Sequence, residues 1–373
     1  MRALIDIRWA AQWSGSVARD ARRVFAAPRR SAAAALVLAA MTGPAFGQGV
    51  AAQGSVAAQG NREIRIGVTA PITGPASAYG VIAKVMLAYM DKVNAEGGIN
   101  GRKVNMITYD DGYDPIKVME ATRKLVEEDQ VLFTMATVGT NTNAAIQPYL
   151  NSKKVPQLFV LSGAAAWDQP QEFPWTMGFL PSYTAEAQIF GQYLLETQPR
   201  SKIAVLYQDD GMGKEYMKGL KDGLAGKMPI VAEATYKVSD TTIDPQLTKL
   251  KASGADVFIE FTTPKFATMS IRRIAELGWK PLHFIPTIAN SYSAVLQPAG
   301  PQNAEGALSV AYRLEGEDAA AAGDVAFREW SAFMQRYVPS VSKTNGQAVL
   351  GYLVSRTLVE VLKNCGDDLS RAP

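Results

Sequence analysis

The sequence contains few of the residues that build metal or thiol centres. Its 373 residues include one cysteine, Cys365, and one histidine, His283. One cysteine cannot form an intramolecular disulfide, and one cysteine and one histidine cannot supply a Cys/His metal cluster. His283 lies in the apolar run Leu282–Ile285, which favours a histidine at a strand edge over a functional one.

The chain also lacks a large block of one charge and the motifs of several enzyme classes. Its 38 basic and 35 acidic residues nearly balance, and no basic block is large enough to indicate nucleic-acid binding. It has no phosphate-binding P-loop, no dinucleotide fingerprint after a strand and no Gly-x-Ser-x-Gly elbow. Ser162 follows a predicted strand, but the single histidine belongs to another strand, which argues against a Ser-His-Asp triad. We therefore expect no enzyme, no catalytic residue, no cofactor and no metal.

Two pairs of carboxylates, Asp110-Asp111 and Asp209-Asp210, follow predicted strands. Such pairs could bind a metal or act as acid and base. More often they cap the turn or helix that follows, and we favour that interpretation.

The first 47 residues are interpreted as an export signal. Positive charge comes from Arg22, Arg23, Arg29 and Arg30. The apolar run 32–41 is too short for a permanent membrane-spanning helix, and Ala45-Phe-Gly47 has small residues suited to a signal peptidase. We expect cleavage near Gly47 and a periplasmic protein. Twin-arginine export and a buried apolar helix are weaker alternatives.

Residues 48–62 are predicted to be a flexible linker. The tract repeats Val-Ala-Ala-Gln-Gly at 50–54 and at 56–60. Small residues without periodicity cannot bury a core.

From Glu63 onward, predicted strands and helices alternate. The strands are 64–68, 104–109, 131–135, 157–161, 202–207, 230–236, 256–261, 283–286 and 307–312, with helices such as 115–128, 185–197, 213–225, 266–277, 323–337 and 346–364. This alternation is typical of α/β proteins with parallel sheets. Nine strands fit two sheets better than one, and the pattern pauses at Phe179–Tyr183.

Residues Arg65–Asp111 predict one βαβ unit, whose first loop lies where open α/β sheets bind ligands. We expect Ser77 to cap its helix and an apolar stripe over 81–93 to face inward. The motifs of this unit occur in a characteristic order: Pro71-Ile-Thr-Gly-Pro75, Ala78-Tyr-Gly80, Asn94-Ala-Glu-Gly-Gly-Ile-Asn-Gly-Arg102 and Tyr109-Asp-Asp111.

In these motifs and their spacing the sequence resembles the leucine/isoleucine/valine-binding protein family, the solute receptors of bacterial ABC importers. The resemblance implies a type I periplasmic binding protein, with two doubly wound parallel-sheet lobes, a hinge of three crossovers and a cleft between the lobes. It implies a first lobe of residues 63–181 plus 313–373 and a second lobe of residues 182–312. The family normally continues beyond the last predicted helix, so we expect the C-terminal part of the second lobe to be missing.

Two loops of small residues after the third and fourth strands are candidate ligand contacts. In the resembled family such loops hold the ligand carboxylate; the matching positions are Thr137, Val138, Gly139, Thr140, Ser162, Gly163, Ala164 and Ala165. The alternative is that they are only tight turns and helix caps. Tyr79 matches a family tyrosine near the ligand, although it could simply pack under the first loop. Trp167 could wall the pocket or pack outside it.

The second lobe departs from the pattern of amino-acid-binding members. Thr287 stands where those members carry an acid that binds the ligand ammonium, and Met212 and Thr263 replace tyrosines of leucine-binding members. An unpaired ammonium in a dry cleft would cost several kcal/mol. A small carboxylate with an apolar or aromatic body therefore fits better than an aliphatic amino acid, with Glu260 as a possible ammonium partner if the ligand is an amino acid.

The resemblance also implies partners. We expect a monomer that closes on its ligand and delivers it to ABC permease subunits in the inner membrane, with their ATPases acting indirectly. The alternative is a sensor that binds a ligand in the same fold and signals to a regulator.

Overall fold

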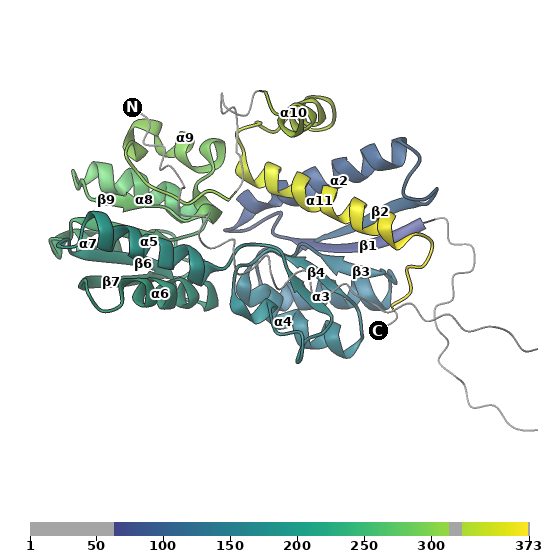
Figure 1. The fold of residues 1–373 in the computed structure, drawn as a ribbon, viewed down its shortest axis with the longest axis horizontal. Helices are drawn as coiled ribbons and strands as arrows, with labels where there is room; N and C mark the ends of the chain where they lie inside the picture. The colour runs from purple at the N-terminus through teal and green to yellow at the C-terminus, as the bar shows by residue number, and fades with distance from the viewer. Residues whose placement is uncertain (1–62, 313–322, 372–373) are drawn as a thin grey trace, which may run out of the picture. The chain divides into compact units, whose positions relative to one another are not determined.

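The computed structural model describes residues 63–312 and 323–371 (Figure 1). The predicted export signal and linker lie outside the described residues. In chain order the elements are β1 (Glu63–Ala70), η1 (Ser77–Tyr79), α2 (Gly80–Ala95), β2 (Lys103–Asp110), α3 (Pro115–Glu127), β3 (Phe133–Met135), α4 (Thr140–Ser152), β4 (Gln157–Val160), η2 (Ala165–Trp167), β5 (Thr176–Gly178), α5 (Tyr183–Thr197), β6 (Ile203–Gln208), α6 (Gly211–Leu224), β7 (Ile230–Tyr236), α7 (Asp244–Ala252), β8 (Val257–Phe261), α8 (Pro264–Glu276), β9 (Leu282–Phe284), η3 (Thr287–Ala289), η4 (Tyr292–Leu296), α9 (Gln297–Ala299), η5 (Pro301–Ala304), α10 (Val325–Tyr337) and α11 (Gly346–Cys365). None of the helices in the described ranges is long and apolar enough to cross a membrane.

The first sheet is parallel, with the strand order β2-β1-β3-β4-β5. β1 pairs along its whole length with β2 and at Ile66 and Gly67 with β3. From Ile64 to Ala70 every residue of β1 except Arg65 is buried. A continuous buried run of this kind is expected for a central strand that is covered on both faces.

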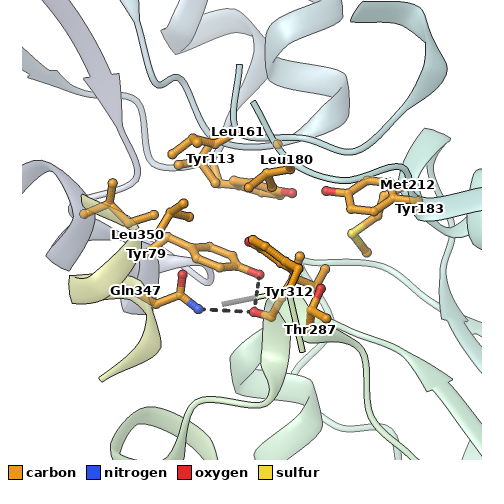
Figure 2. A pocket seen from close by; sticks show the side chains of 14 residues that line it. Tyr79, Tyr113, Leu161, Leu180, Tyr183, Met212, Thr287, Tyr312, Gln347 and Leu350 are labelled. Atoms are coloured by element: carbon orange, nitrogen blue, oxygen red, sulfur yellow. Dashed lines mark hydrogen bonds between the residues drawn. The ribbon is translucent and has the colours of Figure 1, made fainter. Parts of the chain in front are cut away.

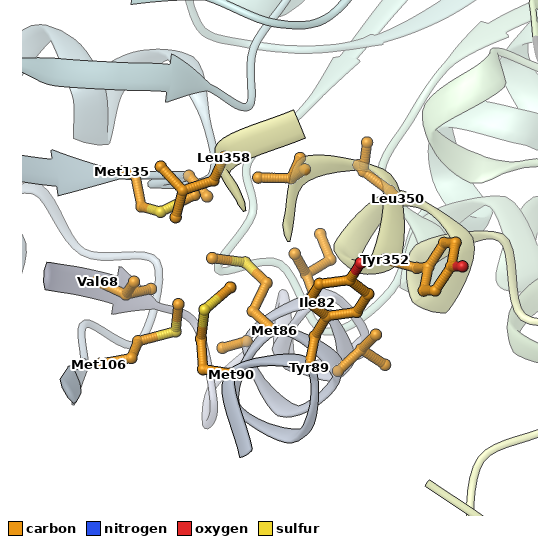
Figure 3. Close-up of a cluster of buried hydrophobic side chains, with 14 of the residues drawn as sticks. Val68, Ile82, Met86, Tyr89, Met90, Met106, Met135, Leu350, Tyr352 and Leu358 are labelled. Atoms are coloured by element: carbon orange, nitrogen blue, oxygen red, sulfur yellow. The ribbon is translucent and has the colours of Figure 1, made fainter. Parts of the chain in front are cut away.

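The last helix, α11, packs against α2 on this sheet, and Figure 1 shows the yellow α11 beside α2. Gly351 lets the backbones of α11 and α2 approach closely. A Cβ added to it would lie only 2.7 Å from the carbonyl oxygen of Ile82. Methionines fill much of the space between the helices and the sheet, among them Met86, Met90, Met106 and Met135 (Figure 3). Unbranched methionine side chains suit irregular gaps of this kind.

The second sheet is also parallel, with the strand order β7-β6-β8-β9. Helices α5 and α6 pack closely against each other at Gly219. The approach leaves no room for a side chain there, since an added Cβ would lie 2.3 Å from the carbonyl oxygen of Thr184. We call the elements of the first sheet, β1–β5 with α2–α4, α10 and α11, the first lobe. The elements of the second sheet, β6–β9 with α5–α9, are the second lobe.

The predicted α/β class with two parallel sheets is confirmed, and the predicted strands from 64–68 to 283–286 all form. The predicted strand 307–312 was wrong. Leu308 forms only a single parallel bridge with Phe284. The ladder stops because the chain turns into η3 at Thr287, whose N–H donates to Glu186 instead of to a neighbouring strand. The structure adds a short strand, β5, that was not predicted.

The predicted cap at Ser77 was also wrong. Ser77 lies inside the 3-10 turn η1, where its N–H donates to the carbonyl of Gly74 and its carbonyl accepts from Gly80. α2 begins after this turn, and its N-cap, Tyr79, makes no side-chain capping bond. The extra turn moves the helix start by one turn and brings Tyr79 inward.

The two lobes are linked at residues 179–183 and by hydrogen bonds between them. The Gly346 N–H donates to the Ser291 hydroxyl oxygen at 3.0 Å. The starts of α4 and α6 also lie close together. A Cβ added to Gly211 would lie 2.9 Å from Cγ2 of Thr140. The second predicted crossover, near 312–313, enters residues 313–322, which are not described. The lobe boundaries therefore stay a prediction.

Candidate functional site

A cavity lies between the two lobes, at the carboxyl ends of strands in both sheets (Figure 2). It is lined by Tyr79, Ile82, Tyr113, Val138, Gly139, Leu161, Leu180, Tyr183, Met212, Thr287, Ile288, Tyr312, Gln347 and Leu350. None of these described residues is acidic, basic or histidine. The walls are therefore aromatic and aliphatic, with polar groups supplied by phenols, one threonine, one glutamine and the backbone.

The cavity volume is about 30 Å³. A single water molecule needs about 10–15 Å³ of such a cavity, so this one has room for a few waters at most. A larger ligand can enter only if the two walls move apart. Since the walls belong to different lobes, this opening is a relative movement of the lobes.

Gly139 forms the part of the first-lobe wall where α4 begins. Its φ of 101° is a conformation that L side chains rarely adopt, and an added Cβ would lie 2.6 Å from Cε2 of Tyr113. Gly139 is the N-cap of α4, whose first N–H groups have no partner within the helix. These groups carry partial positive charge, so this wall can receive an anion without a basic side chain.

Buried hydroxyl pairs connect the loops behind this wall. The hydroxyls of Thr140 and Ser162 lie 2.8 Å apart, and those of Thr69 and Thr137 lie 2.9 Å apart. The Ser162 hydroxyl oxygen also accepts a hydrogen bond from the Ala164 N–H at 3.3 Å. These bonds fix the carboxyl ends of β1, β3 and β4 relative to one another.

Three tyrosines supply flat surfaces around the cavity: Tyr79, Tyr113 and Tyr183. Burial raises the pKa of each above the usual value of 10, so all three remain neutral phenols at physiological pH. The ring of Tyr183 stacks on Tyr216, which stacks in turn on Phe261, with 4.5 Å between ring centroids in both pairs. A neutral aromatic wall of this kind suits an apolar or aromatic ligand body.

The second-lobe wall contains Met212 and Thr287, and a carboxylate lies directly behind it. Glu186 accepts hydrogen bonds from the backbone N–H and the hydroxyl of Thr287, each at 2.8 Å. It also accepts a bond from the phenol of Tyr216 at 3.1 Å. Burial raises the pKa of Glu186 from 4.5 to about 6, although these three donors oppose the shift.

The family profile described as "Periplasmic binding protein" matches residues 63–373. The chain belongs to the periplasmic binding protein family. This confirms the family expected from the motifs between Pro71 and Asp111.

Individual relatives agree with this membership. The chain is 27% identical over 198 residues to Leu/Ile/Val-binding protein homolog 3 of Brucella melitensis, an alignment that covers 52% of this chain and 53% of that protein. The chain thus spans about half the length of this relative.

Solved structures of periplasmic binding proteins show the fold. A substrate-binding periplasmic protein from Ralstonia solanacearum has a TM-score of 0.75 at 21% identity, covering 83% of this chain and 86% of that one. A solute binding protein of an ABC transporter from Rhodopseudomonas palustris BisB5, in complex with 3,4-dihydroxy benzoic acid, has a TM-score of 0.71 at 20% identity, covering 83% of each chain. The predicted type I fold is confirmed.

Five of the residues predicted to bind ligand line the cavity of this periplasmic binding protein: Tyr79, Val138, Gly139, Met212 and Thr287. Thr137, Thr140 and Ser162 lie behind the wall in the buried hydroxyl pairs. Whether any of these residues contacts a ligand stays a prediction.

The remaining predicted residues do not line the cavity. Gly163 packs against the start of α5, where an added Cβ would lie 2.3 Å from the carbonyl oxygen of Pro181. Ala164 is buried beside it, and the N–H of Ala165 points to Glu215 at 3.4 Å. Thr263 precedes α8, where its N–H bonds to the Tyr236 phenol oxygen at 3.0 Å.

Several lining residues were missed by the sequence analysis. They are Ile82, Tyr113, Leu161, Leu180, Tyr183, Ile288, Tyr312, Gln347 and Leu350. Tyr113 could have been found, because it follows Asp110-Asp111 at the carboxyl end of a predicted strand. Gln347 and Leu350 carried no such signal, since they lie on the helix α11 near the C-terminus. Trp167 is buried in the second core cluster and is not among the lining residues.

In each carboxylate pair at least one member, Asp110 or Asp210, acts as a cap, as we favoured. Asp110 accepts hydrogen bonds from the N–H groups of Ile72, Thr73 and Gly112, and Asp210 caps α6 through the N–H of Gly213. The described residues contain no group of three or more His, Cys, Asp or Glu placed to hold a metal.

Glu260, the possible ammonium partner, is fully buried away from the cavity. One of its oxygens lies 2.8 Å from Nε2 of His283, and the other accepts a bond from the Thr262 hydroxyl at 2.7 Å. His283 lies on β9 at the edge of the second sheet, as its apolar surroundings predicted.

Proposed function

We propose that this protein is an extracytoplasmic solute receptor of an ABC importer, and that its ligand is a small carboxylate with an apolar or aromatic body. One observation carries the ligand class: the described cavity walls combine four tyrosines with aliphatic side chains and have no charged side chain. Aromatic walls with a few polar groups are typical of small-molecule sites.

No free acid lines the cavity in the part of the chain that the structure describes, and this argues against an amino-acid ligand. Both oxygens of Glu186 are occupied by donors from Thr287 and Tyr216, and both oxygens of Glu260 face His283 and Thr262. An ammonium beside Thr287 would therefore lack a direct carboxylate partner. Glu186 would attract an ammonium only from behind Thr287, and a buried charge without a directly bonded partner is unfavourable.

The ligand carboxylate fits the first-lobe wall. There the N-terminus of α4 meets the cavity at Gly139, and hydroxyls of Thr140 and Ser162 lie just behind it. Backbone N–H groups at a helix start, supported by hydroxyls, bind anions well. We therefore propose that Val138 and Gly139 meet the ligand carboxylate, with the hydroxyls of Thr140 and Ser162 behind them.

The similar proteins include one named for amino acids and one that holds an aromatic acid, and the second supports the proposed ligand class. The Brucella relative is named for leucine, isoleucine and valine, whereas the Rhodopseudomonas structure holds an aromatic acid. The ligand would close the two lobes by contacting both, and the closed monomer would deliver it to membrane permease subunits.

The test is a binding survey of the purified protein. Thermal melting, tryptophan fluorescence and calorimetry would be recorded with benzoates, hydroxycinnamates, leucine, isoleucine and valine. We expect aromatic carboxylates to raise the melting temperature and the branched-chain amino acids to leave it unchanged, because a ligand that binds only the folded state stabilises it. Binding of leucine or valine without binding of any aromatic acid would overturn the proposed ligand class.

A further inference from the structure

The pair Glu186 and Thr287 determines which hydrogen-bonding groups the second-lobe wall offers to a ligand. Thr287 has two hydrogens to donate, on its backbone nitrogen and on its hydroxyl. Both are directed at Glu186, each across 2.8 Å. An ionised carboxylate only accepts hydrogen bonds, so the direction of these bonds is fixed. Toward the cavity, the Thr287 oxygen therefore offers only lone pairs.

Two neighbouring polar side chains also donate hydrogen bonds within the protein. The phenol of Tyr79 donates to the carbonyl oxygen of Ile288 at 3.2 Å, and the Gln347 side-chain nitrogen donates to the same oxygen at 3.3 Å (Figure 2). A carbonyl oxygen has two lone pairs, so that of Ile288 is fully used. The Tyr79 oxygen, like that of Thr287, retains lone pairs. Gln347 keeps a second N–H and its side-chain oxygen, so this end of the cavity still offers more acceptors than donors.

Charge fixes the orientation of a carboxylate ligand relative to this wall. Glu186 lies directly behind Thr287 and is negative at neutral pH, which disfavours a second carboxylate at this end. The N-terminus of α4 at Gly139 favours a carboxylate at the other end. The part of the ligand nearest Thr287 is therefore the part farthest from its carboxylate.

We propose that Thr287, held by Glu186, is a specificity-determining residue that selects ligands with a hydroxyl group at the end opposite the carboxylate. This inference rests on the proposed function and narrows it to hydroxylated aromatic carboxylates. The ligand hydroxyl donates to Oγ1 of Thr287, with Glu186 as the positioning residue. A substituent that can only accept would place lone pairs against lone pairs and leave the Thr287 oxygen unsatisfied.

The first test compares ligands that differ in this one group. Dissociation constants would be measured by calorimetry at pH 8 for 3-hydroxybenzoate, 4-hydroxybenzoate, benzoate and 4-fluorobenzoate. Fluorine is close to a hydroxyl in size but cannot donate a hydrogen bond. We expect the better hydroxybenzoate to bind about 10-fold more tightly than 4-fluorobenzoate, the usual effect of leaving a buried polar group unpaired.

The second test changes the protein. It measures the ratio of the affinity for the better hydroxybenzoate to the affinity for 4-fluorobenzoate. Thr287→Val keeps the side-chain shape but removes the acceptor, so the ratio should fall to about 1, while Thr287→Ser should preserve it. Glu186→Gln replaces an acceptor with an amide that donates to Thr287, which releases the threonine hydrogen toward the cavity and should also lower the ratio. A purely structural role for Glu186 would weaken both ligands equally.

Matched controls are available in the same lobe. Thr268→Val on α8 removes a hydroxyl that bonds only to the Pro264 carbonyl, and Glu196→Gln changes an exposed acid at the end of α5. Both controls should keep the wild-type ratio. Melting curves would show that each variant is folded, and a ratio measured within one variant is independent of its stability.

The outcomes separate the inference from the proposed function. If hydroxybenzoates and 4-fluorobenzoate bind the wild-type protein equally, or Thr287→Val keeps the wild-type ratio, the role of Thr287 is overturned and the aromatic carboxylate class stands. If no benzoate binds and leucine does, the proposed ligand class fails, and the inference fails with it.

Discussion

The phenol of Tyr79 in the first lobe donates a hydrogen bond to the carbonyl of Ile288 in the second lobe, 3.2 Å away. The Gln347 side chain, also from the first lobe, donates to the same carbonyl. Two side chains on one side of the cavity thus hold one backbone atom on the other. Because a ligand can enter only when the lobes separate, this contact opposes opening.

Tyr79→Phe removes one of these two bonds without changing the shape of the ring. We expect the ligand-free protein to open further, which small-angle scattering would detect as a larger radius of gyration. Affinity for an aromatic carboxylate should fall about 3- to 10-fold, the usual effect of one lost hydrogen bond. Tyr109→Phe is the matched control, since its phenol bonds to Asp129 away from the cavity. Unchanged scattering and affinity in Tyr79→Phe would contradict this account of opening.

Gly139→Ala tests the close packing of the first-lobe wall. Gly97 has almost the same φ, 103° against 101°, but no atom lies within 4 Å of an added Cβ. Gly97→Ala should therefore cost only the backbone strain, about 1–2 kcal/mol. Gly139→Ala should cost about 1–3 kcal/mol more, because Tyr113 must move. Denaturant unfolding measures both, and equal losses would show that Tyr113 does not constrain this position.

Two buried acids predict how stability depends on pH. Burial raises the pKa of Glu186 from 4.5 to about 6 and that of Asp111 from 3.8 to about 6, the latter with help from the charges of Asp110 and Asp114. The groups that face Glu186 are hydrogen-bond donors, from Thr287 and the neutral phenol of Tyr216.

The folded protein therefore binds these two protons more tightly than the unfolded chain does. The free energy of unfolding should rise as pH falls from about 7 to about 4.5, and the gain should be lost again as pH rises through 6. At about 1.4 kcal/mol for each pKa unit, we expect a rise of roughly 2–5 kcal/mol. Urea unfolding at several pH values tests this, and Glu186→Gln and Asp111→Asn should each flatten the dependence. A stability that falls steadily from pH 7 to 5 in the wild-type protein would refute it.

The fold was largely predictable because its central strands are buried on both faces. β6 and β8 are almost wholly apolar and β1 is mostly so, with helical patterns between them, and such runs need little tertiary information to be recognised. β5 was not predictable, since Thr176–Gly178 has no apolar pattern and is a strand only by pairing with β4. The segment 307–312 has an apolar pattern but lacks a partner strand beyond Leu308, because β9 ends at Phe284 and η3 follows.

The candidate site was predictable only where it follows strands. The loop containing Val138 and Gly139 could be found because the carboxyl ends of parallel strands meet at one edge. Tyr183, Gln347 and Leu350 come from helices that reach the cavity only through tertiary packing. Thr287 was identified as a position without an acid, but its link to Glu186 joins residues 101 positions apart and has no local signal.

The most direct test of the proposed function is calorimetric titration of the purified protein with 4-hydroxybenzoate and with leucine under identical conditions. We predict saturable binding of the aromatic acid and no detectable binding of leucine, because the described cavity walls offer aromatic surface and no free carboxylate for an ammonium. Saturable binding of leucine, with no heat from 4-hydroxybenzoate or any other aromatic carboxylate, would contradict the account.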